Sequence, residues 1–176
     1  MSQAITEAPT GQYYEPPMTV QFSVFSDNRV GRLVDLLEVF KGQPVRLAGF
    51  SVVDSADHAV VRLVSSKSVL TRRLLNRHGH AFSEIDVVAV ELPEENDFLR
   101  ACEALLQAEL SVHYAYPLLV KPRGVPVVAL QTDDIVMADQ ILRRRHFTVL
   151  AENDLGDNAP GSRPGEGAEP GGPRGY

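Results

Sequence analysis

The sequence predicts an α+β protein made of two consecutive βαββαβ modules, because strand and helix patterns alternate in that order and the order then returns. Residues 20–24 alternate apolar and polar side chains, which is the period of a half-buried strand. From Arg29 to Phe40 the apolar residues recur at helical spacing instead, and Gly42 with the following Pro44 supplies a stop. A strand therefore leads directly into a helix at the start of the folded part.

The rest of the first copy completes the βαββαβ order. Val45 to Val53 and His58 to Val64 are predicted to form a hairpin, because residues 54–57 favour turns by bonding their own backbone. Ser68 to Arg77 is predicted to be helical, and Phe82 to Ile85 to form a short final strand.

The same order returns in the second half of the chain. Leu33 and Phe40 align without gaps with Leu99 and Leu106, each 66 positions later. The second copy is predicted to have strands at residues 87–92, 112–120, 125–130 and 147–151, and helices at 98–108 and 135–144. Pro126 falls within an inner strand of this arrangement, where a missing amide hydrogen is costly, so we expect a bulge or a later strand start.

A βαββαβ module places two helices on one face of a four-stranded antiparallel sheet and leaves the other face open. Strand alternation assigns the side chains of the first module to these faces. Those expected to point toward the helices are Val20, Phe22, Val24, Ala59, Val61 and Leu63, and those expected to point outward are Gln21, Ser23, Arg62 and Val64.

The two ends of the chain have the composition of appendages. Residues 1–17 have no periodicity, and residues 156–176 are dominated by Gly and Pro, so neither can bury enough surface to offset the entropy of ordering. We therefore expect a disordered N-terminal arm over 1–17, a first module over 18–86, a second over 87–155 and a disordered tail over 156–176.

Composition and charge exclude several classes of function. Hydrophobic residues make up 44% of the chain and charged residues 23%, which is the balance of a globular protein. A formal net charge of −6 gives no overall attraction to nucleic acid or anionic lipid. Neither a leader peptide nor a run of 18 apolar residues is found, and the single cysteine suits a reducing compartment. We expect a cytoplasmic protein without nucleic-acid or membrane partners.

No arrangement of residues in the sequence predicts catalysis. Cys102 lies in the apolar stripe of a predicted helix, so we expect a buried small side chain there and not a nucleophile. The five histidines include no pair at helical i, i+4 spacing, and no nucleotide-binding loop or Ser-His-Asp set is found. Residues 58–64 lack the aromatic side chains with which an RNA-recognition module stacks bases. We expect no cofactor, no metal and no enzyme activity.

The junction between the first strand and helix carries a recognisable pattern. Residues 25–33 read Phe-Ser-Asp-Asn-Arg-Val-Gly-Arg-Leu, a short polar turn with Asn, then Gly, then Leu just inside the helix. This resembles the ACT-domain family, as do residues 112–116 and 147–155, and the resemblance covers roughly residues 18–155. It implies two ACT-type modules of ferredoxin-like fold that bind small ligands, usually amino acids, and pair their antiparallel sheets side by side.

The turn also suits a carboxylate on physical grounds. Amides at a helix N-terminus carry partial positive charge, and glycine allows a ligand to approach the main chain closely. The predicted ligand-binding residues are Asp27, Asn28, Arg29, Val30, Gly31 and Leu33. The structural alternative is that Asp27 or Asn28 caps the helix and Gly31 is an ordinary first-turn residue.

The second copy departs from this pattern, because Asp97 stands where the first copy has Gly31 and Glu94 and Glu95 precede it. These carboxylates suit a helix N-terminus but repel an incoming carboxylate. We expect the second module to keep the fold as a pairing surface; a cation or amine bound there is the alternative.

These features together predict a non-catalytic sensor that binds a small amino acid and regulates amino-acid metabolism. Its output would act in trans or through its oligomeric state, with a homodimer expected. The alternative is a ligand-free ACT-like interaction module, for example a regulatory subunit of an amino-acid biosynthetic enzyme.

Overall fold

The computed structural model describes residues 18–27, 29–55 and 58–156. The predicted N-terminal arm, Asn28 and the tail beyond Gly156 lie outside the described residues. The elements are β1 (Thr19–Asp27), α1 (Arg32–Glu38), β2 (Leu47–Ser55), β3 (His58–Ser65), α2 (Ser68–Arg77), β4 (Ala81–Glu91), α3 (Asp97–Gln107), β5 (Val112–Pro117), β6 (Val127–Thr132), α4 (Ile135–Arg144), β7 (Val149–Leu150) and a 3-10 helix (Glu152–Leu155).

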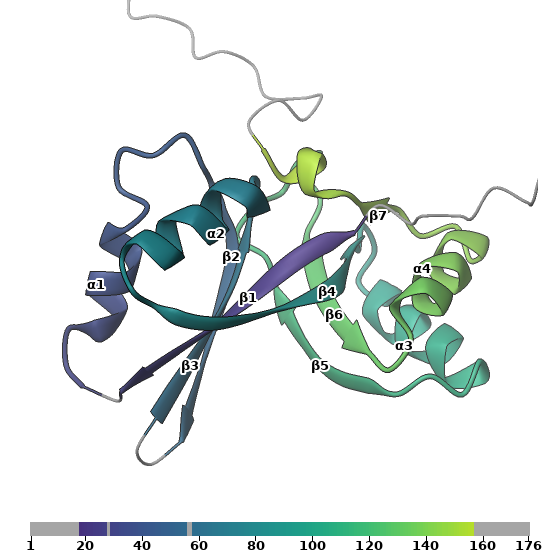
Figure 1. Ribbon diagram of the computed structural model, residues 1–176. Helices are drawn as coiled ribbons and strands as arrows, with labels where there is room; N and C mark the ends of the chain where they lie inside the picture. Colours follow the sequence, from purple (N-terminus) through teal and green to yellow (C-terminus); the bar gives the residue numbers. More distant parts are fainter. Residues whose placement is uncertain (1–17, 28, 56–57, 157–176) are drawn as a thin grey trace, which may run out of the picture.

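The strands form an antiparallel sheet in the order β2-β3-β1-β4-β6-β5 (Figure 1). The short β7 pairs with Ala89 and Val90 of β4, on the edge opposite β6. In the first module β1 lies between β3 and β4, and in the second module β4 lies between β6 and β7. Each half is therefore a βαββαβ unit with its first strand inside. The predicted α+β fold, with two modules whose sheets adjoin side by side, is confirmed.

One strand belongs to both modules. Residues 81–87 of β4 pair with β1, and residues 88–91 pair with β6. The prediction of two separate strands at 82–85 and 87–92 is wrong, because no glycine or proline interrupts this segment. The predicted module boundary, between residues 86 and 87, lies inside the continuous strand.

Each module buries an apolar core between its sheet and its helices. In the first module Phe22, Val24, Val61 and Leu63 pack under α1 and α2, with Val20 partly buried beside them, so these five predicted helix-facing residues are confirmed. The sixth, Ala59, is half buried near the end of the hairpin and is not part of this core. In the second module the core between the sheet and the helices α3 and α4 consists of Val88, Val90, Ala101, Leu105, Leu130, Ala138, Leu142, Phe147 and Val149.

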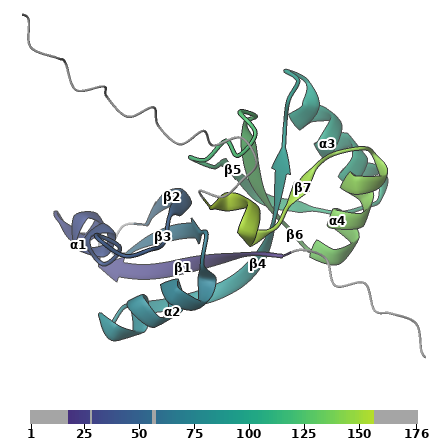
Figure 2. The ribbon, with the colours of Figure 1, turned by 90° about the horizontal axis from the view of Figure 1, so that it is seen from above.

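A third core lies between the two modules. It joins side chains on the helix-free faces of both sheets to residues of the loop after β5 and of the 3-10 helix. The sheet residues are Ala48, Val64, Val87, Ala89, Tyr116, Val127, Ala129 and Leu150, and the others are Leu118, Val120 and Leu155. Figure 2 shows the result: the strands meet in the middle and the helices of each module lie on the outside. The prediction of an open outward face is therefore wrong for the part covered by the other module, where Gln21 and Val64 are fully buried.

Two local predictions about the second module have different outcomes. β6 begins at Val127, directly after Pro126, so the later strand start is confirmed. Cys102 is only half buried, because Ala101, Ala104 and Leu105 occupy the inward side of α3. The prediction that Cys102 is buried is therefore wrong, because the neighbouring Ala101 takes the inward position on the helix.

Buried Gln21 connects the modules through hydrogen bonds. Its amide nitrogen donates to Tyr114 Oη at 2.9 Å and to Ser23 Oγ at 3.1 Å, and Tyr116 Oη donates to its carbonyl oxygen at 2.8 Å. Burial, followed by the neighbouring Tyr114, raises the pKa of Tyr116, so this phenol remains a donor. A side chain predicted to face outward is thus a fully bonded link to the second module.

The two outer strands of the sheet also approach each other. The amide of Leu119, just after β5, donates to the carbonyl of Ala48 in β2 at 2.7 Å. Beside it, a Cβ atom at Gly49 would overlap the side chain of Leu118. Gly49 is therefore required by close approach of the second module, which no local pattern in the sequence reveals.

We expect Gln21→Leu to lower the free energy of unfolding by about 1–3 kcal/mol, because Tyr116 Oη would be left buried without a partner. Chemical denaturation of the full chain measures this. Gln43→Leu, at an exposed position, is the control and should change stability by less than about 0.5 kcal/mol. Equal effects of the two substitutions would contradict a role for Gln21 in joining the modules.

We expect Gly49→Ala to destabilise the protein by about 1–3 kcal/mol through overlap with Leu118. Adding Leu118→Ala should relieve the overlap, so the double variant should lose less stability than the two single variants together. Additive losses in this double-mutant cycle would show that the two residues do not compete for space.

Candidate functional site

The predicted ligand turn lies between β1 and α1, at the end of the first module farthest from β7 (Figure 1). Asp27 is the last residue of β1, and its carbonyl accepts the amide of Arg29 at 2.9 Å. Gly31 stands at the N-cap of α1 with φ 92°, a left-handed conformation that glycine adopts without strain. The alternative in which Asp27 or Asn28 caps the helix and Gly31 lies in its first turn is therefore wrong.

The charged side chains of this turn are exposed and loosely paired. The Asp27 carboxylate lies 3.6 Å from the guanidinium of Arg32 and 4.0 Å from that of Arg29. Burial lowers the pKa of His80, and His78 and Arg32 lower it further, so His80 adds little positive charge at neutral pH. Arg29 and Arg32 are balanced in number by Asp27 and by Asp35 in the first turn of α1, so a carboxylate would be attracted by individual guanidinium groups and not by a net positive charge of the turn.

The apolar residues of the turn point to different surroundings. Val30 is fully exposed, so its prediction as part of the buried helical stripe is wrong, because α1 begins only after Gly31. Leu33 is half buried and packs against the core of the first module. The described residues of the predicted site thus lie close together where β1 leads into α1, and among them only Leu33, in the first turn of α1, packs inward.

The corresponding turn of the second module is closed by its own side chain. Asp97 is buried, and its carboxylate accepts the amide of Glu94 at 3.0 Å and the guanidinium of Arg100 at 2.5 Å. Both carboxylate oxygens are therefore used within the turn. Across residues 18–27, 29–55 and 58–156 no three His, Cys, Asp or Glu side chains gather into a metal site.

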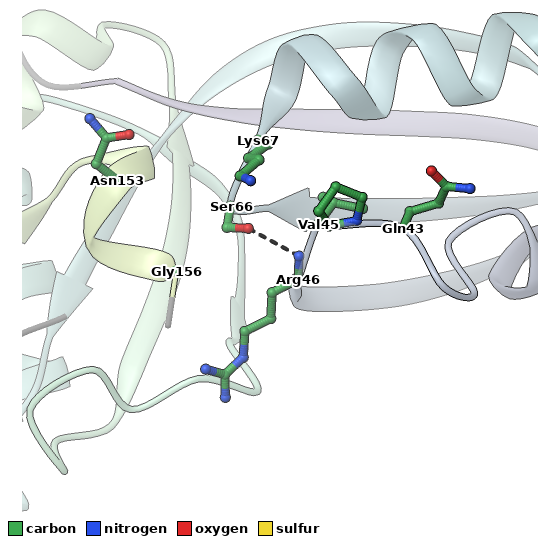
Figure 3. A pocket seen from close by; sticks show the side chains of 8 residues that line it. Gln43, Val45, Arg46, Ser66, Lys67, Asn153 and Gly156 are labelled. Carbon is green, nitrogen blue, oxygen red and sulfur yellow. Dashed lines mark hydrogen bonds between the residues drawn. The ribbon is translucent and has the colours of Figure 1, made fainter. Parts of the chain in front are cut away.

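A hollow of about 530 Å³ lies elsewhere, where the N-terminus of α2 meets the C-terminal 3-10 helix (Figure 3). It is lined by Gln43, Pro44, Val45, Arg46, Ser66, Lys67, Asn153 and Gly156. Ser66 Oγ accepts the amide of Arg46 at 3.0 Å. The sequence could not predict this hollow, because three separate segments of the chain form it.

The amides at the start of α2 already have an anionic partner. The Glu152 carboxylate accepts the amide of Ser68 at 2.8 Å, whereas no side chain at the N-cap residue Lys67 does so. Glu152 therefore caps a helix of the first module from the end of the second, and the most favourable place for an anion at α2 is filled by the protein itself.

Most of the chain is similar to one described family and to several solved structures. A family model described as an ACT domain pair matches residues 18–159. The structure of protein BT0572 from Bacteroides thetaiotaomicron has a TM-score of 0.72 and 21% identity, covering 79% of this chain and 96% of that one. The ligand-free regulatory subunit of aspartate kinase from Thermus thermophilus has a TM-score of 0.52 and 8% identity, covering 73% and 92%. No curated protein matches the sequence.

At these identities the structural matches indicate a shared fold. In the part of the chain that the structure describes, no helix is long and apolar enough to cross a membrane.

We expect Glu152→Ala to lower the free energy of unfolding by about 0.5–2 kcal/mol, because α2 would lose its only side-chain cap among the described contacts. Thermal and chemical denaturation of the full chain measure the loss. The neighbouring exposed Asn153→Ala should change stability by less than about 0.5 kcal/mol. A Glu152→Ala variant as stable as Asn153→Ala would mean that water caps α2 equally well.

Proposed function

Because the chain belongs to the ACT domain pair family, we propose that it is a non-catalytic regulatory protein whose first module binds a small amino acid at the β1–α1 turn. Its role would be in the regulation of amino-acid metabolism in the cytoplasm. The proposal assigns the ligand to Asp27, Asn28, Arg29, Val30, Gly31 and Leu33, with Asn28 lying outside the described residues.

The observation that carries the proposal is the left-handed Gly31 at the start of α1, with no side-chain cap among the described residues and with the guanidinium groups of Arg29 and Arg32 nearby. Glycine leaves the main chain accessible, because no atom of the described residues lies within 4 Å of the position of its absent Cβ. The guanidinium groups of Arg29 and Arg32 can attract a carboxylate to this turn. The second module has Asp97 at the corresponding place and would repel it.

The other groups of an amino acid also have candidate partners at the turn. The Asp27 carboxylate is exposed and can accept an ammonium group. Val30 is fully exposed and Leu33 half buried, so together they can contact a small apolar side chain.

For regulation, the protein must have two states that bind the ligand with different affinity. A ligand shifts an equilibrium only by its differential affinity for the two states. We propose that the second state is a different pairing of modules, within a homodimer or with an enzyme partner. The second module would then act as the pairing surface and not as a ligand site.

A ligand-free regulatory subunit of an amino-acid biosynthetic enzyme is the second candidate function. Exposed apolar side chains favour it, because Leu99 and Leu106 of α3 are 59% and 73% exposed. The Thermus thermophilus protein of similar fold is described as a regulatory subunit of aspartate kinase, which makes an enzyme partner a reasonable candidate.

We expect a thermal-shift screen of the full chain against the twenty amino acids to give a selective rise in melting temperature, because a ligand that binds only the folded state stabilises it. Gly31→Trp should abolish this rise, since the indole would cover the turn. At a ligand concentration 100 times Kd, binding should raise the free energy of unfolding by about 2.7 kcal/mol.

The matched control is Gly124→Trp, in the loop between β5 and β6. Gly124 also has a positive φ, 76°, and free space at its Cβ position, so this variant carries a similar backbone strain away from the turn. It should retain the rise seen for the unmodified protein. No rise with any amino acid would favour the ligand-free subunit, and an unchanged rise in Gly31→Trp would move the ligand site elsewhere.

A further inference from the structure

Arg62 lies in the middle of β3 on the helix-free face, at the edge of the contact with the second module. Its guanidinium carbon is 3.9 Å from the centre of the Tyr114 ring, which belongs to β5. This stacking uses the flat face of the guanidinium and leaves the N–H groups on its rim for hydrogen bonds in the plane. Both residues are half buried.

No carboxylate of the described residues pairs with Arg62, and the sheet around it carries none. The residues paired with it directly across the sheet are Ser51, Ser23 and, one strand further, Ser83. Two positions along the strands toward the second module, the same face carries Gly49, Val64, Gln21 and Ile85. Two positions the other way it carries Val53, Val60, Phe25 and Ala81. Along β1 the next carboxylate on this face is Asp27, which already lies near Arg29 and Arg32.

Two hydroxyl groups beside Arg62 have hydrogens to donate. The Gln21 amide nitrogen donates to both Ser23 Oγ and Tyr114 Oη, so each oxygen is an acceptor toward Gln21. Within the described part of the chain no acceptor takes the hydrogens of these two hydroxyls. Fully buried Gln21 therefore holds two half-buried hydroxyls around a cation, with their donor capacity unused.

We propose that Arg62, Ser23 and Tyr114 form a binding site for the carboxylate of a small molecule at the junction of the two modules. A planar guanidinium with free rim N–H groups matches a carboxylate in two parallel hydrogen bonds, and the two hydroxyls supply further donors. Gln131, which pairs with Tyr114 across the β5–β6 ladder, carries no net charge, although its buried amide oxygen has no hydrogen-bond partner among the described residues.

This site is separate from the β1–α1 turn. Ser23 and Asp27 are four residues apart along β1, which corresponds to about 13 Å at the usual rise of a strand. A carboxylate held at Arg62 therefore occupies a second position, in contact with residues of both modules. Its occupation would stabilise the contact between β3 and β5, whichever ligand the turn accepts.

The test is an NMR titration of the full 15N-labelled chain with sodium acetate, the smallest probe of carboxylate binding. We expect saturable shifts of the Arg62 side-chain Nε–H and of the Ser23 and Tyr114 amides. Neither sodium chloride at equal ionic strength nor the neutral isostere acetamide should reproduce them. Arg62→Gln should weaken acetate binding about tenfold or more, as the loss of a charge-assisted hydrogen bond predicts.

Ser23→Ala and Tyr114→Phe test the hydroxyls while leaving the stack and the sheet in place, and each should weaken acetate binding by about threefold to tenfold. Arg29→Gln at the turn is the matched control and should leave the Arg62 shifts unchanged. Shifts that do not saturate, that chloride reproduces, or that persist in Arg62→Gln would overturn the site. Amino-acid binding lost in Gly31→Trp would still support the turn in that case, so the two proposals fail independently.

Discussion

Burial of the helix-free faces of both sheets against each other is the constraint on which the rest of the structure depends. A module of this size has two faces to its sheet but helices for only one of them. The chain covers much of the second face by bringing its own second copy against it, with apolar side chains such as Val64, Tyr116 and Leu118 between the sheets. Neither module would bury this surface alone, so each depends on the other for stability.

Because β4 is one continuous strand, it fixes how the two modules are oriented relative to each other. Its first half is the last strand of one module and its second half the first strand of the other, so no flexible linker separates them. Glu152 and Gln21 add polar links between the same two bodies. A ligand bound at the junction would therefore act directly on the pairing of the modules.

The two copies have diverged most clearly at equivalent turns. In the first, Gly31 leaves the main chain accessible beside exposed Arg29 and Arg32. In the second, Asp97 is buried and bonded within its own turn. The two modules thus share a fold but differ at this turn. The turn at Gly31 has room for an anion, whereas the turn at Asp97 already contains the carboxylate of its own side chain.

The sequence by itself determined the order of elements, their approximate bounds and the helix-facing core of the first module, because strand and helix periodicities are local properties of the chain. It also identified the β1–α1 turn, whose residues are consecutive. Only the tertiary structure decided that residues 81–91 form one strand, that Gln21 is buried, and that Arg62 of β3 lies against Tyr114 of β5. These features depend on segments brought together by apolar burial between the modules, and alternation along one strand says which face a side chain is on but not what covers that face.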